Sequence, residues 1–433
     1  MKRISSLLLP LLTAFCCGIA MAADKPIRVY IMAGQSNMVG TGAISTFDHI
    51  GEDPQTAPLL EQMRGKDGKP YVCERVWISY LNGRQNQYGG EGIGRLTAGY
   101  GLREKDKHDQ PWDHIGPEYL FGITMEQAYE GPVLIIKTAW GGQSLSTHFR
   151  SPGSGPYELN DWQKDDYAKR GILDSVSERQ RKETGQNYRW MMDHVKKVLA
   201  DIKRVYPDYD GSQGYHLAGF VWFQGFNDLI DGHTYPPGLG DSRYDQYSTL
   251  LAQFIRDVRK DLNAPDLPFI IGVAGQNGNF TPGTYDTRGG PERWMRLFRK
   301  AMAAPAEMPE FKGTVAAVQT APYWDEKLGA LSMKSLQINW AGQRLDKQQM
   351  EERTKLKELP ADERRKRENE LNEEKKAHLE KLRAELFTEE DEAYLKRATG
   401  PGGSIHYFGT AKFHAQAGNA FAEAILKMEP REP

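Results

Sequence analysis

The 433-residue sequence predicts an α/β sandwich with one parallel sheet, because short apolar runs alternate with longer helix-like segments. Each run is almost continuously apolar, which is typical of a parallel strand covered on both faces. The predicted strands are Ile27–Ala33, Val133–Thr138, Leu217–Phe223, Phe269–Ala274 and Thr314–Thr320. The predicted helices are Pro117–Tyr129, Asn187–Val205, Arg243–Leu262, Pro291–Ala303 and Ala411–Lys427.

Residues 1–22 are predicted to be a signal peptide and not part of the fold. They contain two basic residues, then an apolar stretch, then Ala20-Met21-Ala22. An N-terminal anchor is the alternative, although the apolar stretch is short for a membrane-spanning helix, and no later segment approaches the required length. We therefore expect a secreted or periplasmic protein that does not associate with a membrane after signal removal.

Composition narrows the possible partners and metal sites. The net charge of −2 gives no indication of a nucleic-acid partner. Removal of the signal peptide leaves Cys73 as the remaining cysteine, so no internal disulfide is expected. Cys73 lies in Tyr71–Ile78, whose β-branched and aromatic residues suit a strand, and an inert, packed thiol is expected there. No Cys/His cluster has the spacing of a structural zinc site.

One α/β domain is predicted over residues 23–342 and 397–433, interrupted by a charged helical insertion at 343–396. The insertion is dense in Lys, Arg and Glu and carries only a thin apolar stripe, with a helix break expected at Pro360. Solvated, ion-paired helices are one interpretation, and a coiled coil that binds a partner protein is the other. In either case we expect the insertion to be dispensable for chemistry.

Small polar residues follow the first predicted strand at Gly34–Asn37, which reads Gly-Gln-Ser-Asn. Ligands of parallel sheets bind at the carboxyl ends of the strands. A serine in a tight turn at this edge can present its hydroxyl as a nucleophile, and Ser36 is the candidate. Helix capping by Ser36 or Asn37 is the alternative.

Two later turns offer donors for an oxyanion. Gly141 and Gly142 follow the second predicted strand, where glycine lets a backbone N–H approach a ligand closely. Asn227 follows the strand that ends at Phe223 and can donate from its side-chain amide. An ordinary turn and an Asx-turn are the respective alternatives.

His406 precedes the last predicted helix and can act as a general base near neutral pH. A structural histidine is the alternative, and His414, inside that helix, is expected to be a packing or surface residue.

These four motifs resemble the sequence blocks of SGNH hydrolases, a superfamily of esterases with a flavodoxin-like three-layer sandwich. Gly34–Met38, the Gly-Gly pair and Trp222–Gly225 are similar to the sialate O-acetylesterase and acetylxylan esterase branch. The resemblance spans roughly residues 26–340 and 404–427. It implies Ser36 as nucleophile and His406 as base. The backbone N–H groups of Ser36 and Gly142, with Asn227, are the implied oxyanion donors, and Gly141 is the alternative to Gly142. Gln35, Gln224 and Trp140 are candidates for substrate binding.

The sequence departs from the family pattern at Gly403, where an aspartate usually stands three residues before the histidine. Either a backbone carbonyl then orients His406, giving a Ser–His dyad, or a remote acid does. Asp228 and Asp325 are the candidates for a remote acid.

The expected function is removal of O-acetyl groups from a glycan by a serine esterase that needs no metal or cofactor. The expected partner is therefore an acetylated carbohydrate. Trp140, Trp222, Tyr323 and Trp324 are aromatic candidates for stacking on sugar rings. A glycan-binding module with a degenerate site is one alternative, favoured by Gly403, and a scaffold that recruits a partner through the charged helices is another.

Overall fold

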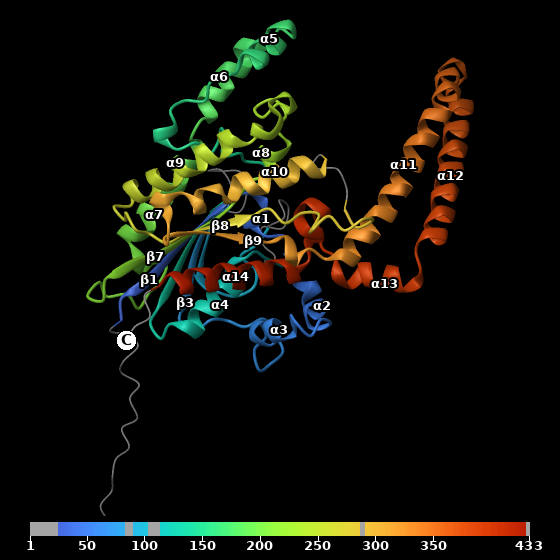
Figure 1. The fold of residues 1–433 in the computed structure, drawn as a ribbon. Coiled ribbons are helices and arrows are strands. Elements are labelled where there is room, and N and C mark those ends of the chain that lie inside the picture. Colours follow the sequence, from blue (N-terminus) through green and yellow to red (C-terminus); the bar gives the residue numbers. More distant parts are fainter. Residues whose placement is uncertain (1–24, 83–89, 103–112, 286–290, 430–433) are drawn as a thin grey trace, which may run out of the picture.

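A seven-stranded sheet lies at the centre of the computed structural model, which describes residues 25–82, 90–102, 113–285 and 291–429 (Figure 1). The predicted signal peptide lies outside the described residues. The strand order is β4-β3-β6-β1-β7-β8-β9, and every neighbouring pair is parallel except β3 and β4. The strands are β1 Ile27–Gly34, β3 Val76–Asn82, β4 Gly90–Arg95, β6 Val133–Ala139, β7 Tyr215–Phe223, β8 Phe269–Val273 and β9 Val315–Gln319. The α/β prediction is confirmed, with an added antiparallel edge strand.

Helices and one small sheet complete the molecule. A two-stranded sheet pairs β2 (Gly42–Ala43) with β5 (His114–Ile115). The helices are α1 Ser36–Val39, α2 Phe47–Gly51, α3 Ala57–Met63, α4 Glu118–Ala128, α5 Asp161–Lys169, α6 Leu173–Glu183, α7 Gln186–Ala200, α8 Phe226–Ile230, α9 Asp245–Asp261, α10 Glu292–Ala303, α11 Glu326–Lys355, α12 Ala361–Leu386, α13 Glu389–Ala398 and α14 Ala411–Met428. None of these helices, in the part of the chain that the structure describes, is both long and apolar enough to cross a bilayer.

The sheet is covered on both faces, which explains the continuous apolar runs of its strands. Side chains of a strand alternate between the two faces. Val29 and Ile31 of β1 belong to one core cluster, which also contains residues of α7, α9 and α10. Tyr30 and Met32 belong to the opposite cluster, with residues of α4 and α14. The result is a three-layer α/β fold.

The strand register brings three strand ends to the same edge. Gly34, the last residue of β1, is opposite Ala139 at the end of β6 and Phe223 at the end of β7. The segments that follow these three strands therefore begin side by side, although more than a hundred residues separate the first from the second.

The strand predicted over Tyr71–Ile78 is displaced in the structure. β3 begins only at Val76, and it continues to Asn82. Residues before it form a connection in which Cys73 is fully buried in the core. Burial raises the pKa of the Cys73 thiol, because the apolar surroundings disfavour the thiolate. The expectation of a packed thiol is confirmed, and the strand boundary was wrong.

The charged segment forms a hairpin of α11 and α12 that projects from the core, after which α13 returns to it (Figure 1). The break falls at Pro360, as predicted, and ion pairs such as Lys375–Asp346 and Arg367–Glu352 link the two long helices. α11 already begins at Glu326, where the Asp325 side chain caps it by accepting from the Leu328 N–H. Residue 343 is therefore inside a continuous helix.

Candidate active site

Ser36 lies in the tight turn that follows β1. Gly34 must be glycine, because a Cβ atom there would lie 2.1 Å from the carbonyl oxygen of Phe223 on β7. The backbone of β1 can consequently pass directly against β7 and turn, and the Gln35 N–H donates to the Phe223 carbonyl at 3.2 Å. Ser36 is then the first residue of α1, half-buried at the carboxyl edge of the sheet.

His406 meets Ser36 from a segment that is 370 residues later in the chain. Its Nε2 lies 2.9 Å from Ser36 Oγ, and its Nδ1 lies 3.1 Å from the carbonyl oxygen of Gly402. A carbonyl can only accept, so Nδ1 carries the proton and Nε2 is free to accept from the serine hydroxyl. Burial lowers the pKa of the His406 imidazole, and the hydrogen bond to Gly402 opposes part of that lowering. The His406 imidazole is thus held in the tautomer whose Nε2 can accept from Ser36 Oγ.

The loop around His406 contains two non-glycine residues with positive φ angles, and side-chain contacts stabilise this conformation. Tyr407 and Phe408 both have positive φ angles, 51° and 61°. The Tyr407 hydroxyl accepts from the Gly275 N–H at 2.9 Å, and the Phe408 ring packs on Trp324 with 4.8 Å between centroids. These contacts stabilise a conformation that would be costly in isolation and fix the histidine towards the serine.

Neither remote acid proposed from the sequence contacts His406. Asp228 is fully buried and accepts from the Leu145 and Ser146 N–H groups at 2.8 and 3.0 Å. Asp325 caps α11 and pairs with His49 Nε2 at 3.0 Å. The suggestion of a remote acid was wrong, because both carboxylates are committed elsewhere. The backbone alternative holds, with Gly402 as the carbonyl.

The backbone conformation favours glycine at position 403, where the resemblance to SGNH hydrolases implied an aspartate. The Gly403 backbone has φ 58° and ψ −165°, a region open essentially to glycine only. Its carbonyl accepts from the His406 and Phe408 N–H groups at 3.1 and 2.7 Å, which closes the loop. The loop that supplies the Gly402 carbonyl therefore excludes a side chain at position 403.

Hydrogen bonds to the Gln35 side chain fix the orientation of the Asn227 amide. The backbone N–H groups of Gly225 and Asn227 lie 3.0 and 3.3 Å from Gln35 Oε1, and an N–H can only donate. The Gln35 Nε2 therefore points to Asn227 and donates to its Oδ1 at 3.0 Å. Asn227 is left with its Nδ2 donor on the other side, with no hydrogen bond to any residue that the structure describes.

The Gly141–Gly142 turn lies against the serine. A Cβ atom at Gly141 would be 3.9 Å from Ser36 Cβ, and Gly142, with φ 72°, faces open space. Both glycines are exposed, so a backbone N–H of this turn is accessible to a bound molecule. The Asp228 carboxylate holds this segment in place, because it accepts from the backbone N–H groups of Leu145 and Ser146, which follow the turn.

Three residues predicted to bind substrate are buried instead. Gln35 and Gln224 are each 2% exposed, and Gln224 Nε2 donates to Asp228 Oδ2 at 2.6 Å and to the Gln143 carbonyl at 3.0 Å. The Trp140 ring, 4% exposed, packs against Phe149 and Trp190 in the core. The two amides hold the turns by hydrogen bonds, and the indole is packed among aromatic side chains of the core.

The other predicted aromatic platforms are also core residues or distant. Trp222 is fully buried and Trp324 is 6% exposed behind the His406 loop. Tyr323 lines a separate pocket with Asp325 and Tyr394. His414 is fully buried, and its Nε2 accepts from the Thr41 N–H at 3.2 Å, which agrees with the packing role expected for it.

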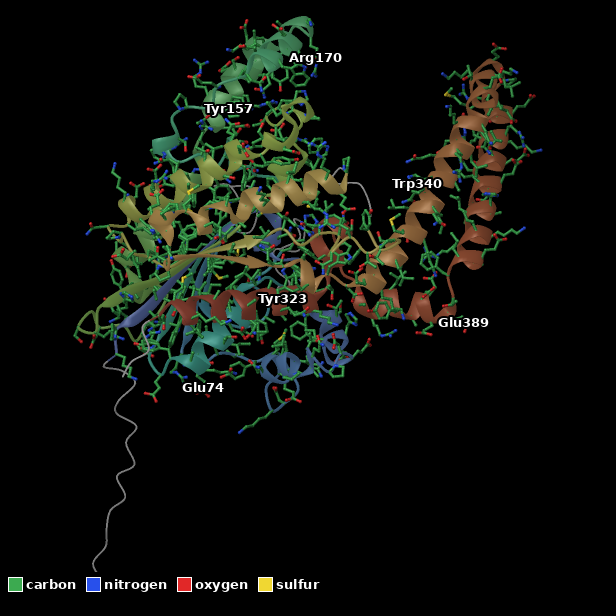
Figure 2. The ribbon with its side chains drawn as sticks, viewed as in Figure 1. Glu74, Tyr157, Arg170, Tyr323, Trp340 and Glu389 are labelled. Carbon is green, nitrogen blue, oxygen red and sulfur yellow. The ribbon has the colours of Figure 1, made fainter. Side chains whose placement is uncertain are left out.

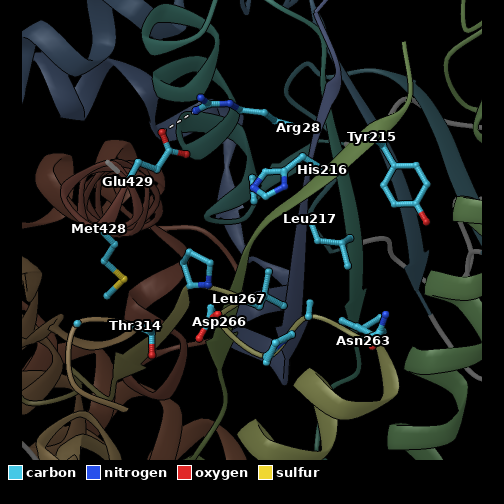
Figure 3. A pocket seen from close by; sticks show the side chains of 16 residues that line it. Arg28, Tyr215, His216, Leu217, Asn263, Asp266, Leu267, Thr314, Met428 and Glu429 are labelled. Atoms are coloured by element: carbon cyan, nitrogen blue, oxygen red, sulfur yellow. Dashed lines mark hydrogen bonds and ion pairs between the residues drawn. The ribbon is translucent and has the colours of Figure 1, made fainter. Parts of the chain in front are cut away.

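A cavity of about 400 Å³ has Gly142 and Asn227 in its wall. Gly141, next to Gly142, lies against Ser36. A second cavity, of about 920 Å³, lies at the opposite edge of the sheet, by the amino-terminal residues of β7 (Figure 3). Its lining includes Arg28, which pairs with Glu429 at 2.6 Å. Arg28 is near the start of β1 and Ser36 follows its end, so this second cavity lies away from the serine. Within the described ranges no group of three His, Cys, Asp or Glu side chains could hold a metal ion.

A backbone carbonyl was one of the alternatives expected from the sequence, but nothing in the sequence identified it as that of Gly402. The orienting role of Gln35 and the supporting role of Asp228 were not predicted. A signal for Asp228 was present, since it directly follows Asn227 and lies four residues after Gln224. Its partners are the backbone N–H groups of Leu145 and Ser146, in a segment that is distant in sequence. Because they are backbone groups, the residue types at these positions do not predict the contact.

Solved structures similar to this chain share little sequence with it. They include a protein from Arabidopsis thaliana (15% identity, 72% of this chain and 98% of that chain, TM-score 0.37). A carbohydrate acetylesterase from Xanthomonas citri matches at 13% identity over 67% of this chain and 49% of its own, with a TM-score of 0.37. NanS matches at 13% identity over 68% of this chain and 78% of its own, with a TM-score of 0.35. At these scores the structures carry no argument about family.

No curated protein matches the chain. The model of one family matches residues 98–320, which is just over half of the sequence. That family is described as carbohydrate esterase, sialic acid-specific acetylesterase. The matched range contains Gly142 and Asn227, whereas Ser36 and His406 lie on either side of it. This chain therefore belongs to the family of sialic acid-specific acetylesterases and is a carbohydrate esterase.

Proposed function

We propose that the protein is a secreted or periplasmic serine esterase that removes O-acetyl groups from a glycan through an acetyl-enzyme on Ser36. The observation that carries the proposal is the contact of 2.9 Å between His406 Nε2 and Ser36 Oγ, combined with the tautomer that Gly402 imposes. The signal-like residues 1–22 support export. The same contact weighs against a retired, glycan-binding site.

In the first half of the reaction Ser36 Oγ attacks the acetyl carbonyl carbon while its proton moves to His406 Nε2. The carbonyl oxygen becomes negatively charged in the tetrahedral intermediate. Asn227 Nδ2 and backbone N–H groups of Ser36 and the Gly141–Gly142 turn are the proposed donors to this oxygen. The imidazolium then returns its proton to the departing sugar oxygen, the ester C–O bond breaks, and the acetyl group stays on Ser36.

In the second half a water molecule attacks the acetyl-serine, and His406 takes one of its protons. The second tetrahedral intermediate collapses with the proton returned to Ser36 Oγ, and acetate leaves. The Gly402 carbonyl stabilises the imidazolium that forms in both halves by accepting from Nδ1. It carries no net charge, so this stabilisation is smaller than that from an aspartate. No step requires a metal ion or a cofactor.

The test is hydrolysis of para-nitrophenyl acetate by the wild type, Ser36→Ala and His406→Ala, followed by acetate release from a panel of acetylated glycans. We expect turnover by the wild type and essentially none by either variant. Brief treatment with acetyl ester, followed by mass spectrometry of the peptide that contains Ser36, should detect the acetyl group. A Ser36→Ala variant with wild-type turnover would refute the mechanism.

A further inference from the structure

One helical projection supplies part of the wall of the 400 Å³ cavity. This projection is the arm formed by α5 and α6, with Arg170 between its helices (Figure 2). Arg179 of α6 lines the cavity together with Gly142 and Asn227, two of the proposed oxyanion residues. The α11–α12 hairpin, the projection on which Figure 2 labels Trp340, contributes no residue to this cavity. The arm is therefore the projection that a glycan bound at the site would meet.

Hydrogen bonds fix the start of the arm against the segment that follows α8. Asn160 Nδ2, just before α5, donates to the His233 carbonyl at 3.1 Å. The Tyr157 hydroxyl lies 2.8 Å from Thr234 Oγ1. Asp231, in the cavity wall, accepts from the His233 and Thr234 N–H groups at 3.0 and 2.9 Å. The arm consequently has a defined position relative to the cavity.

Three aromatic side chains form a cluster where the arm meets this segment. The centroids of the Trp162 indole, on α5, and the His233 imidazole are 4.8 Å apart. Tyr167, also on α5, stacks on the same imidazole at 5.8 Å, with an angle of 14° between the ring planes. Trp162 is nonetheless 50% exposed, whereas tryptophan is highly buried on average. We call Trp162, Tyr167 and His233 the arm platform.

The arm platform is continuous with the cavity wall. Ile230 and Asp231 of that wall lie just before His233 in the chain, and Ile230 is 49% exposed. Burial, followed by the charge of Asp231, raises the pKa of the Tyr167 phenol, and the charge of Arg179 opposes this. Tyr167 is therefore close to two charged residues of the wall. The platform residues are outside the cavity lining, so a sugar ring on them is distinct from one in the cavity.

We propose that the arm platform is a second sugar subsite, which binds a ring of the glycan other than the one that carries the acetyl ester. This rests on the proposed function of Ser36. The C–H face of a sugar ring is apolar and can pack on the half-exposed Trp162 indole, while its hydroxyls need polar neighbours. The Asp166 carboxylate, 4.0 Å from His233 Nε2, supplies an acceptor beside the rings. The enzyme therefore prefers an oligosaccharide to the corresponding single sugar.

The size of the apolar surface favours a sugar over a protein partner. Trp162 is the one exposed large apolar side chain of α5 and α6. An aromatic side chain can bury about 150–250 Å². Stable protein interfaces bury about 1,200–2,000 Å², which is far more than one indole supplies. A sugar ring needs only one face of the indole, and the platform lies where a glycan chain can continue from the cavity.

The test compares two pairs of substrates, and within each pair the acetylated ring is the same. One pair is O-acetylated sialic acid and O-acetylated sialyllactose, and the other is monoacetylated xylose and monoacetylated xylotetraose. We expect the wild type to have a kcat/KM about tenfold higher for the oligosaccharide of at least one pair. The gain should come mainly through KM, because the second ring adds binding that the chemical step does not change.

The variants are Trp162→Ala, Trp162→Tyr and the control Trp340→Ala, which removes a comparably exposed indole (47%) from the α11–α12 hairpin. We expect Trp162→Ala to lower the oligosaccharide-to-monosaccharide ratio of kcat/KM by about tenfold, because the aromatic contact and its buried area are lost. Trp162→Tyr should keep part of the ratio, since it retains a smaller ring. Trp340→Ala should keep the wild-type ratio. Each ratio is formed within one protein, so a loss of folded enzyme cancels.

Binding to the Ser36→Ala protein separates this inference from the proposed function. Calorimetry with the same sugars should show tighter binding of the oligosaccharide, and the Ser36→Ala/Trp162→Ala double variant should lose the difference. If no acetyl ester is turned over, the proposed function fails and calorimetry still decides the subsite. If the esterase is active but hydrolyses both members of each pair equally, or if Trp162→Ala keeps the wild-type ratio, the subsite inference is overturned.

Discussion

Asn227 depends for its orientation on a buried glutamine, so the oxyanion site can be tested at two residues. Asn227→Ala removes the proposed side-chain donor and should reduce kcat by about 100-fold or more, the usual loss for one such donor. KM should change much less, because the hydrogen bond strengthens only in the transition state. Steady-state kinetics on para-nitrophenyl acetate measures both constants.

Gln35→Glu should cause a similar loss with Asn227 still present. A carboxylate keeps the acceptor for the Gly225 and Asn227 N–H groups but has no donor for Asn227 Oδ1. The Asn227 amide is then expected to rotate and point its Nδ2 at the new carboxylate, away from the substrate. Combining Gln35→Glu with Asn227→Ala should add little to the loss from Asn227→Ala, and additive losses would contradict the orienting role.

Restoring the family aspartate should damage this enzyme. Gly403→Asp places a side chain where φ is 58° and ψ is −165°, which costs about 1–3 kcal/mol in local strain. The loop that aims His406 at Ser36 would shift, so we expect lower kcat than in the wild type. Kinetics and thermal unfolding of Gly403→Asp, with Gly403→Ala as a control for strain without charge, measure the effect. Increased activity in Gly403→Asp would show that the loop can accept a triad.

The lowered pKa of His406 predicts the acid limb of the pH profile. The base must be neutral to accept the serine proton, and burial disfavours its protonated form. The kcat/KM should therefore persist at pH values below the ordinary histidine pKa of about 6.5 and fall only at a lower pH. A pH series on a neutral acetyl ester checks this, and a midpoint above that ordinary value would contradict the burial argument.

At the scale of elements, the distal part of the α11–α12 hairpin is held by contacts within the hairpin, whereas the start of α11 and all of α13 pack on the core. Lys375 Nζ and Asp346 Oδ2 lie 2.6 Å apart, so the two helices are side by side at that level. Tyr394 of α13 is 9% exposed and donates to Asp325 Oδ2, and Phe387 just before α13 is 7% exposed. The charged segment therefore has a distal part and a packed part.

Replacing residues 347–374 by a short glycine-serine loop should leave esterase activity and thermal stability close to wild type, because this part adds no residue to the active-site cavity. Deleting all of 343–396 should lower Tm clearly, because it also removes Phe387 and Tyr394 from the core. Differential scanning fluorimetry and kinetics on both deletions test this division. Loss of activity in the shorter, well-folded deletion would show that the hairpin shapes the site.

At the scale of the whole molecule, a buried ion pair connects the sheet with the segments after β1. Lys137 of β6 and Glu118 of α4 are both fully buried and lie 2.7 Å apart. Lys137 Nζ also donates to the carbonyl oxygens of Val39 and Tyr100 at 2.9 and 2.8 Å. The Lys137 ammonium group therefore links β6 to α4 and to Val39, the last residue of α1.

Lys137→Met should destabilise the fold by about 3–5 kcal/mol, because Glu118 would remain as a buried, unpaired charge. The double variant Lys137→Met/Glu118→Gln should recover part of that loss, since no charge is then left unpaired. Urea unfolding of the wild type and both variants measures the free energies. Equal stability of Lys137→Met and the wild type would show that Glu118 accepts a proton or water at little cost.

The sequence by itself determined the parallel core and the positions of the candidate residues along it. A strand that is covered on both faces of the sheet needs apolar side chains at nearly every position, so a continuous apolar run predicts such a strand. The turn of Gly34–Asn37 and the placement of Asn227 after β7 follow from the same strands, since each lies within four residues of a strand end.

Only the tertiary structure decided how His406 is oriented, which way Asn227 presents its amide and which helix lines the cavity next to Gly142 and Asn227. These outcomes depend on the Gly402 carbonyl, on Gln35 Oε1 meeting two backbone N–H groups, and on α6 lying beside α8. Backbone carbonyl groups occur in every residue and N–H groups in every residue except proline, so residue types do not reveal which of them will form a contact. The direction of a hydrogen bond becomes defined only when distant segments have packed together.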